Sequence, residues 1–437
     1  MDQTTETSAT TAPHKKGIGL IGLIALVISS SIGSGVFALS TDISAAAAPG
    51  PAIIAWLITG IGFIALANTF GRLSLERPNL DGIVAYAREG FGPFVGFVSG
   101  WGYWLSIWIG NVAFGVMLAT AIGYFFPPFA GDLTVGAVVF ISVINWLIVL
   151  LVNHGIEEAS VVNAIVMICK LVPMWVFVGM EGASVLGHRA ERKSDVSRAT
   201  ILGVTALVVI YVAASVLPYG YLTRDELLQM GSPSMAYIFQ EVVGPWGGAF
   251  ISGGLVISIF GAWLSYTILA SEAMNRMARM ELLPRSFSKL NDHNAPTSCL
   301  IITGLMIQLL SIVMLFSEAA YQFAYSLCTA SIVISWALAS AYMVKLAKRR
   351  EVEHSGSALA LSVFATAFLV IAILLAGVDL LMLCCIGYVP GLAFYVKARH
   401  DYGSATVISG REKLLAAFIV VVAVIAVALL ATGYITI

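Results

Sequence analysis

The chain has 437 residues, of which 59% are hydrophobic and only 11% are charged, and its net charge at pH 7 is −1. Soluble domains carry about 25% charged residues, so this composition excludes a soluble globular protein. The net charge gives no reason to expect nucleic acid as a partner. The mean hydropathy of +0.93 indicates an all-α polytopic membrane protein whose helices lie in a lipid bilayer.

The sequence lacks the residue patterns of metal sites and of enzymes. No two of the six histidines have the spacing of metal ligands, and the five cysteines lie in apolar runs without a disulfide framework. We find no HExxH motif, no Ser/His/Asp set in the spans and no phosphate-binding Gly-x-x-x-x-Gly-Lys loop. We therefore expect no metal, no other cofactor, no enzymatic activity and no use of ATP.

The predicted spans begin after a polar N-terminal segment. Residues 1–16 predict a disordered tail, and the first apolar run has no signal-peptide cleavage site, so we expect one transmembrane domain at 17–437. A spanning helix needs about 20 mostly apolar residues. Runs of this kind lie at 18–39, 51–70, 92–125, 134–152, 199–221, 244–271, 298–316, 319–344, 357–376, 378–396 and 414–436, with one more apolar segment at 159–187.

The first predicted span reads LVISSSIGSGVFAL, with Gly33, Ser34 and Gly35 at its centre. Each glycine weakens a helix by about 1 kcal/mol relative to alanine. A span broken at this point exposes backbone N–H groups that can bind a carboxylate. Close packing of helices through small residues is the alternative explanation.

Two later spans carry Asn111, in WIGNVAF, and Trp263, in GAWLSYTILASE. An amide within a span bonds either a substrate or a neighbouring helix. Aromatic residues in spans mostly pack or anchor at the interface, but Trp263 lies near polar residues rather than at a span end. Its ring could therefore attract a cation.

The segment ICKLVPMWVFVGMEGASVLG at 168–187 holds Glu181 between two glycines. An ionisable residue within a span is a functional candidate, because burying its charge costs at least about 2.5 kcal/mol. A structural carboxylate bonded to neighbouring helices is the alternative. Two glycine-broken spans in corresponding halves of a chain indicate an inverted-repeat transporter.

The basic residues conflict with the length of this segment. They cluster at 15–16, 72–88, 189–198, 276–289, 345–350 and 397–413, which leaves out only Lys170 and Arg224. Basic loops mark the cytoplasmic side, so the N-terminus is predicted to be cytoplasmic. All clusters share that side only if 159–187 returns to the side where it started. Two spans and a turn would need about 40 residues, more than the segment contains.

Four motifs make the sequence similar to a known family. IGSGVF at 32–37, WIGNVAF at 108–114, WVFVGMEGASV at 175–185 and GAWLSYTILASE at 261–272 resemble the basic amino acid/polyamine antiporters of the amino acid–polyamine–organocation superfamily. The loop PNLDGIVAYAREGFG at 78–92 resembles the superfamily's Pro-x-x-Gly-Gly-x-x-x-Tyr loop, with Asp81 in place of the first glycine. The similarity runs from about residue 17 to the C-terminus and is strongest to arginine/ornithine antiporters.

The resemblance implies two five-helix inverted repeats, at about 17–173 and 174–345, followed by additional spans at about 357–437. It implies an integral protein of a bacterial inner membrane that exchanges arginine for ornithine by alternating access. By the same likeness, the backbone near Ile32, Gly33, Ser34 and Gly35 holds the α-carboxylate of the substrate.

The resemblance also assigns the remaining site residues. The carbonyl groups near Trp175, Val178 and Gly179 are expected to bind the α-ammonium group. Trp263 is expected to stack on the cationic side chain and Asn111 to contact the substrate. Trp175 and Glu181 are expected to act in gating.

The sequence departs from the family between Pro173 and Met174. The outer half of span five, the following loop and the outer half of span six have no counterpart, which indicates an internal deletion. This deletion leaves open a transport-dead variant that acts at most as an assembly partner or sensor. An exchanger of lysine/diamine type also stays open, because the span motifs do not distinguish these substrate pairs. The oligomeric state is not predicted.

Overall fold

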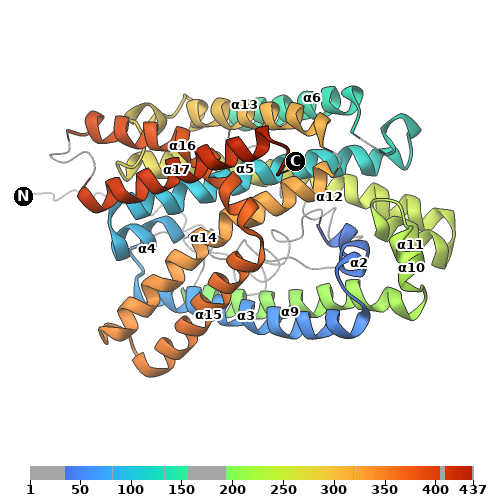
Figure 1. Cartoon of the computed structure of the whole chain (residues 1–437), viewed down its shortest axis with the longest axis horizontal. Coiled ribbons are helices and arrows are strands. Elements are labelled where there is room, and N and C mark those ends of the chain that lie inside the picture. Colours follow the sequence, from blue (N-terminus) through green and yellow to red (C-terminus); the bar gives the residue numbers. More distant parts are fainter. Residues whose placement is uncertain are drawn as a thin grey trace, which may run out of the picture.

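The computed structural model describes residues 35–80, 82–131, 133–155, 193–317, 319–403 and 409–435. Within these ranges the chain forms helices and no strand, and ten helices are long and apolar enough to cross a membrane. They are α3 (Pro49–Glu76), α5 (Pro93–Gly123), α6 (Val135–His154), α9 (Lys193–Val216), α12 (Pro245–Arg279), α13 (Thr297–Val313), α14 (Ala320–Lys348), α15 (Ser355–Leu375), α16 (Val378–Asp401) and α17 (Gly410–Ala431). The predicted all-α polytopic fold is confirmed, and Figure 1 shows most of these helices running side by side.

Shorter helices connect the long ones. They are α2 (Gly35–Ala46), α4 (Gly82–Phe91), α10 (Arg224–Leu228) and α11 (Ser234–Val243), with the 3-10 turns η1 (Pro127–Phe129), η3 (Leu217–Gly220), η4 (Arg285–Ser288) and η5 (Met314–Phe316). Thr223 caps α10 with its side chain, and its backbone N–H and hydroxyl donate to Glu226, which lowers the pKa of that carboxyl group.

Several helices extend beyond the apolar runs that predict them. The run at 244–271 belongs to a helix that reaches Arg279, and the run at 319–344 belongs to one that reaches Lys348. An apolar run measures the thickness of the hydrocarbon layer, whereas the helix itself continues into the charged headgroup region.

The helix α2 likewise continues to Ala46, beyond the apolar run predicted at 18–39. Arg224 stabilises this longer helix: its Nε donates to the carbonyl of Ser44 at 2.8 Å. A cation at the C-terminus of a helix satisfies carbonyl groups that the last turn leaves without a partner. Arg224, which lies outside the basic clusters, therefore has a local structural role.

The helices α5 and α12 begin in the same way. Each starts with a proline, Pro93 or Pro245, after a glycine whose φ angle is positive, 96° at Gly92 and 89° at Gly244. Glycine adopts this conformation without a steric penalty, and proline is well suited to the first helical turn. In both cases a short helix, α4 or α11, precedes the Gly-Pro pair, so two distant segments share one local design.

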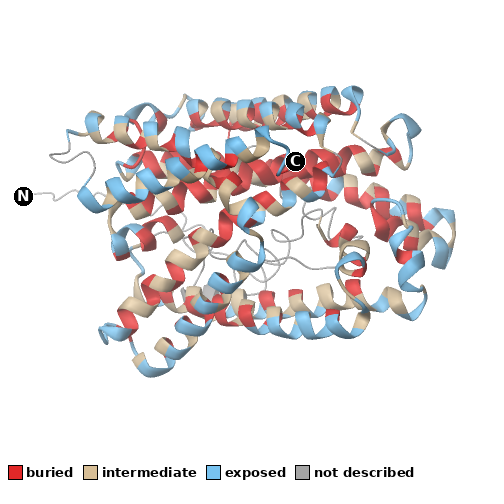
Figure 2. Cartoon of the chain, viewed as in Figure 1, coloured by how far each residue is buried: buried red, intermediate tan, exposed pale blue. Residues whose placement is uncertain are grey.

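Burial is concentrated in these two helices. In α5, 89% of the membrane-spanning window is buried, against 67% in α12 and 11% in α17. Figure 2 shows the buried residues along the centre of the bundle and exposed residues along its edges. The central pair therefore forms the protein interior, while the edge helices present apolar side chains outward.

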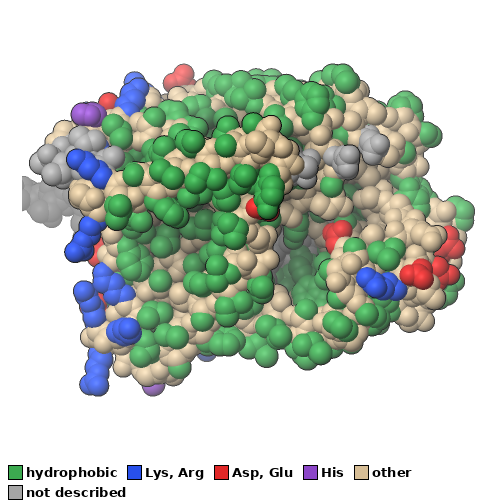
Figure 3. Space-filling view, in the orientation of Figure 1, with side chains coloured by type: hydrophobic (Ala, Val, Ile, Leu, Met, Phe, Trp, Pro, Cys, Tyr) green, Lys and Arg blue, Asp and Glu red, His purple; other side chains and the backbone are tan. Residues whose placement is uncertain are grey.

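Basic side chains gather at one end of the bundle, which we call the basic end. Arg77, Lys345, Lys348 and Arg349 belong to it. Arg77, after α3, pairs with Glu351, after α14, at 2.7 Å. The start of α5 packs on the end of α16 through Phe94 and Tyr395, and the hydroxyl of Tyr402 donates to Ala278 near the end of α12. Figure 3 shows Lys and Arg side chains along this end, at the left.

The helices on either side of residues 156–192 meet this same end. The end of α6 lies against the loop after α12, because Asn291 donates to the carbonyl of Asn153 at 2.8 Å. The helix α9 runs antiparallel to α3, since Trp56 contacts Tyr211 and Gly60 faces Val208. The chain therefore leaves and re-enters the described bundle at one end, as the charge clusters predict, while the path between lies outside the described residues.

Candidate functional site

Three of the predicted site residues lie in the described part of the chain: Gly35 on α2, Asn111 on α5 and Trp263 on α12. The others fall outside the described residues, as do the tail at 1–16 and the junction at Pro173. They are Ile32, Gly33, Ser34, Trp175, Val178, Gly179 and Glu181.

The contact between α5 and α12 brings Asn111 and Trp263 together. Asn111 and Gly115 are four residues apart and therefore share one face of α5. A Cβ atom at Gly115 would lie 3.0 Å from Cη2 of Trp263 and 2.8 Å from Cγ2 of Ile141. The missing side chain of Gly115 thus provides the space for the indole, one helical turn from the amide.

A hydrogen-bond chain joins the two residues through Thr267. Nδ2 of Asn111 donates to the hydroxyl of Thr267 in a long hydrogen bond of 3.4 Å. That hydroxyl donates in turn to the carbonyl of Trp263 at 3.0 Å. Thr267 therefore fixes the amide of Asn111 against the helix that carries Trp263.

Two polar atoms of this cluster are buried without a hydrogen-bond partner among the described residues: Oδ1 of Asn111 and Nε1 of Trp263. Both residues are fully buried. Leaving a buried polar atom unpaired costs about 1–3 kcal/mol. An amide acceptor and an indole donor that have no partner in the described ranges, together with the large indole ring, suit a polar ligand with an apolar or cationic portion.

The helix α14 links this cluster to Gly35. A Cβ atom at Gly35 would lie 3.5 Å from the ring of Tyr325 on α14. One turn further along, Cys328 lies 3.4 Å from the hydroxyl of Ser106 and faces Gly110, the neighbour of Asn111. The helix α14 therefore contacts α2 at Gly35 and contacts α5 at Gly110, next to Asn111.

Hydrogen bonds from three other helices hold α2 in place. Ser40 donates to the carbonyl of Ala214 on α9 at 2.9 Å, and Ser234 on α11 donates to the carbonyl of Phe37 at 3.2 Å. Together with Arg224, these contacts fix α2 along its whole length. The position of Gly35 thus depends on the second half of the chain.

Sequence reasoning missed Thr267, Tyr325 and Cys328. Thr267 follows Trp263 by four residues, so helical spacing alone places it on the same face and could have identified it. For Tyr325 and Cys328 the sequence contains no such signal, because their proximity to α2 and α5 depends on how α14 packs.

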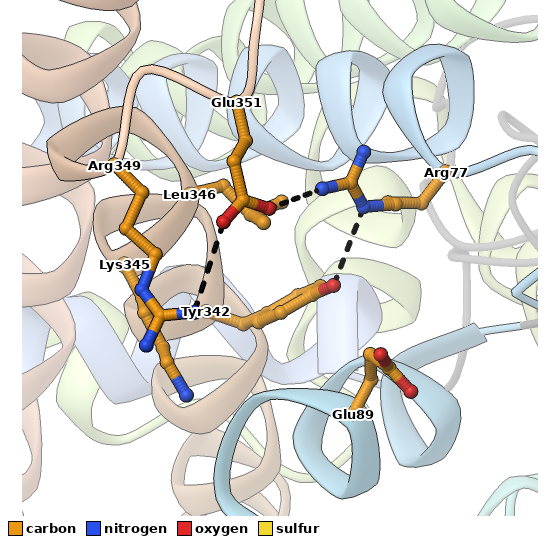
Figure 4. A pocket seen from close by; sticks show the side chains of 7 residues that line it. All are labelled: Arg77, Glu89, Tyr342, Lys345, Leu346, Arg349 and Glu351. Atoms are coloured by element: carbon orange, nitrogen blue, oxygen red, sulfur yellow. Dashed lines mark hydrogen bonds and ion pairs between the residues drawn. The ribbon is translucent and has the colours of Figure 1, made fainter.

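The cavities at the basic end share no residue with this cluster. The smaller one, of about 90 Å³, lies among charged residues. Figure 4 shows Glu351 between Arg77 and Arg349, with the hydroxyl of Tyr342 also accepting from Arg77. In the part of the chain that the structure describes, no group of three His, Cys, Asp or Glu residues could hold a metal.

The ten helices that are long and apolar enough to cross a membrane define a polytopic membrane protein. Comparison with known proteins agrees: the model of the amino acid permease family matches residues 18–177 and 171–425. The chain therefore belongs to the amino acid permease family. The two matched pieces overlap at 171–177.

Named relatives cover nearly the whole chain. The "Arginine/ornithine antiporter" of Latilactobacillus sakei is 45% identical over 471 residues, covering 97% of this chain and 99% of the relative. A protein of the same name from Pseudomonas aeruginosa is 34% identical over 95% of this chain and 97% of the relative. The "Arginine/agmatine antiporter" of Chlamydia felis is 32% identical over 96% of this chain and 97% of the relative.

Proposed function

We propose that this protein exchanges arginine for ornithine across the membrane by alternating access. The observation that carries the proposal is the similarity to the Latilactobacillus sakei antiporter, which extends over almost the full length of both proteins. The described site supports it, because Asn111 and Trp263 combine an amide with a large aromatic surface in a buried position. A cationic side chain is attracted to such a ring by about 0.5–2 kcal/mol.

Within this proposal the backbone at Ile32, Gly33, Ser34 and Gly35 binds the α-carboxylate. The carbonyl groups near Trp175, Val178 and Gly179 bind the α-ammonium group. Trp263 stacks on the guanidinium group, and Trp175 and Glu181 gate the site. Asn111 contacts the substrate through Oδ1, which has no hydrogen-bond partner among the described residues.

The burial of Trp263 has a mechanistic consequence. Its indole is fully buried in this structure, so a stacked cation must take the place of groups that now cover the ring. Binding and release therefore require α5 and α12, or the elements beside them, to separate. A closed site that opens to one side at a time is the requirement of alternating access.

The arrangement of the helices supports the two-repeat organisation at about 17–173 and 174–345, with additional spans at about 357–437. In each repeat a span leads to a short helix, a Gly-Pro pair and then a long central helix, α5 or α12. The first short helix lies at the basic end and the second at the opposite end, as an inverted repeat requires. By the positive-inside rule we expect the basic end to face the cytoplasm. Within this proposal the N-terminus is also cytoplasmic, and the protein lies in a bacterial inner membrane, as its bacterial relatives suggest.

A transport-dead variant is the second candidate function. The alignment with the Latilactobacillus sakei relative spans 471 residues, more than the 437 of this chain, so that relative has positions without a counterpart here. The two ranges that match the family model, 18–177 and 171–425, overlap at 171–177. Both observations favour a deletion between Pro173 and Met174, which would remove the half-helix that faces the substrate.

One experiment distinguishes the two candidates. The purified full chain is reconstituted into liposomes loaded with ornithine, lysine, agmatine or buffer, and uptake of labelled arginine is measured. If the protein exchanges arginine for ornithine, labelled arginine should enter ornithine-loaded liposomes much faster than liposomes loaded with buffer. Absence of counterflow from correctly folded protein contradicts exchange. The transport-dead variant predicts that inserting an outer loop and half-helix between Pro173 and Met174 restores counterflow.

A further inference from the structure

A groove of about 390 Å³ lies at the basic end, beside the end of α4 and between α14 and α15. It is lined by Phe91, Ala341, Val344, Lys345, Lys348, Arg349 and Thr366. We propose that this groove binds an anionic phospholipid, with an acyl chain along its apolar floor and the headgroup phosphate at Lys348 and Arg349.

The floor of the groove is apolar and continues into the bilayer-facing surface. Ala341 and Val344 lie on α14, and Phe91 is 41% exposed at the end of α4. The hydroxyl of Thr366 on α15 lies 2.7 Å from the carbonyl of Ser362, to which it donates, and 2.9 Å from the hydroxyl of Ser340, so it presents little unsatisfied polarity. Only 22% of the membrane-spanning window of α15 is buried. The remaining surface meets acyl chains in a membrane.

The cations of the rim differ in how far they are already engaged. Lys345 donates to the carbonyl of Gly90 and lies 5.6 Å from the ring of Phe91. Lys348 is exposed and has no ion pair within the described residues. Lys345 is therefore already engaged by α4, whereas Lys348 is available to bind an anion.

Arg349 is the second available cation. It lies 3.7 Å from Oε1 of Glu351, but the other oxygen of that carboxylate accepts from Arg77 at 2.7 Å. The side chain of Arg349 is 62% exposed. Glu351 is thus neutralised mainly by Arg77, and Arg349 can turn towards a phosphate, which guanidinium groups bind through paired hydrogen bonds.

Charge complementarity selects an anionic headgroup. The end of α14 reads KLAKRRE, with four basic residues against one acidic residue. Each Lys or Arg near a membrane surface contributes about 1 kcal/mol to the attraction of anionic lipid, or about fivefold in affinity. A zwitterionic lipid would fill the same floor without this contribution.

The proposal is tested with purified, delipidated full-length protein. The protein is equilibrated with micelles that contain phosphatidylglycerol and phosphatidylcholine with identical acyl chains, and the retained lipid is counted by native mass spectrometry. We expect phosphatidylglycerol to be enriched at least fivefold over phosphatidylcholine. K348Q should reduce the enrichment about fivefold, and K348Q/R349Q should abolish it. Equal retention of both lipids by the wild type overturns the proposal.

A charge-matched control separates a site from diffuse attraction. Arg411 and Lys413 are exposed at the start of α17 and belong to the same set of basic clusters. R411Q/K413Q removes the same charge as K348Q/R349Q and should leave the enrichment unchanged. If both double variants lose it equally, the lipid responds only to overall charge and the groove carries no site.

Two further measurements test the acyl chain. A341W or V344W fills the floor while keeping every cation, and a variant that stays monodisperse should retain much less phosphatidylglycerol than the wild type. If such a variant retains as much phosphatidylglycerol as the wild type, the proposed position of the acyl chain is wrong. Inorganic phosphate at constant ionic strength should displace no bound lipid, whereas complete displacement would indicate a free-phosphate site instead.

Discussion

The helices α5 and α17 are both long and apolar, yet 89% of the spanning window is buried in α5 and 11% in α17. The sequence of α17 is mostly Val, Leu, Ile and Ala, whereas α5 contains glycines, serines, tryptophans and an asparagine. Lipid tails are as apolar as leucine, so hydrophobicity does not bring helices together in a membrane. Small residues that allow close approach, and polar groups that bond across helices, select which helix is central.

The largest expected effect comes from enlarging a small residue in the buried helix α5. G115V on α5 would force a side chain into Cη2 of Trp263 and Cγ2 of Ile141. Overpacking of this kind costs about 1–3 kcal/mol. We expect a clear fall in the thermal unfolding midpoint of the detergent-solubilised protein and loss of arginine binding.

The matched variant is A428V on α17, at an exposed position of a lipid-facing helix. It adds two carbon atoms, against three in G115V, at a position exposed in this structure, and should leave the unfolding midpoint unchanged. Equal destabilisation by A428V and G115V would contradict the contrast between the two helices.

A smaller effect is expected from the polar group that bridges α5 and α12. T267V removes the hydroxyl that accepts from Asn111 and donates to the carbonyl of Trp263. Net loss of one such interaction costs about 1 kcal/mol, so the apparent affinity for arginine in binding assays should fall about fivefold. T267S keeps the hydroxyl and should restore it.

T432V at the end of α17 is the control for this prediction. The hydroxyl of Thr432 donates only within its own helix, to the carbonyls of Ala428 and Leu429. Its removal should not alter arginine affinity. A loss similar to that of T267V would show that the assay reports general instability rather than the bridge between α5 and α12.

The smallest effect is expected for the ion pair at the basic end. Arg77 and Glu351 are 29% and 40% exposed, and pairs of this kind contribute about 0–1 kcal/mol. R77Q should therefore shift the unfolding midpoint only slightly, and less at high salt. If R77Q lowered the unfolding midpoint as much as G115V does, the surface ion pair would stabilise the protein as strongly as the packing of the central helices, which contradicts the comparison.

Much of the fold could be predicted from the sequence, because each span needs a long apolar run and the described helices coincide with such runs. Helix ends were less predictable. The helix α12 reaches Arg279 because a helix need not stop where the hydrocarbon layer stops. The extension of α2 to Ala46 depends on Arg224, a contact across 180 residues of chain that no local pattern reveals.

The site was predictable in part. Asn111 and Trp263 stand out as unusual side chains within spans, and the structure places them on facing helices joined by Thr267. The space for the indole arises from Gly115, one of several glycines in α5, and nothing in the sequence distinguishes it from the others. The roles predicted for the glycine-broken segments around Gly33 and Glu181 stay predictions.

The central claim is that Trp263 recognises the positive charge of the substrate, and competition binding of arginine and its neutral isostere citrulline tests it most directly. The ring is buried beside Asn111, and a cation on its face gains about 0.5–2 kcal/mol. The account predicts that W263A weakens the binding of arginine by about 1–2 kcal/mol more than the binding of citrulline. W263F should keep part of the wild type's preference for arginine over citrulline. Equal losses for the two ligands would contradict it.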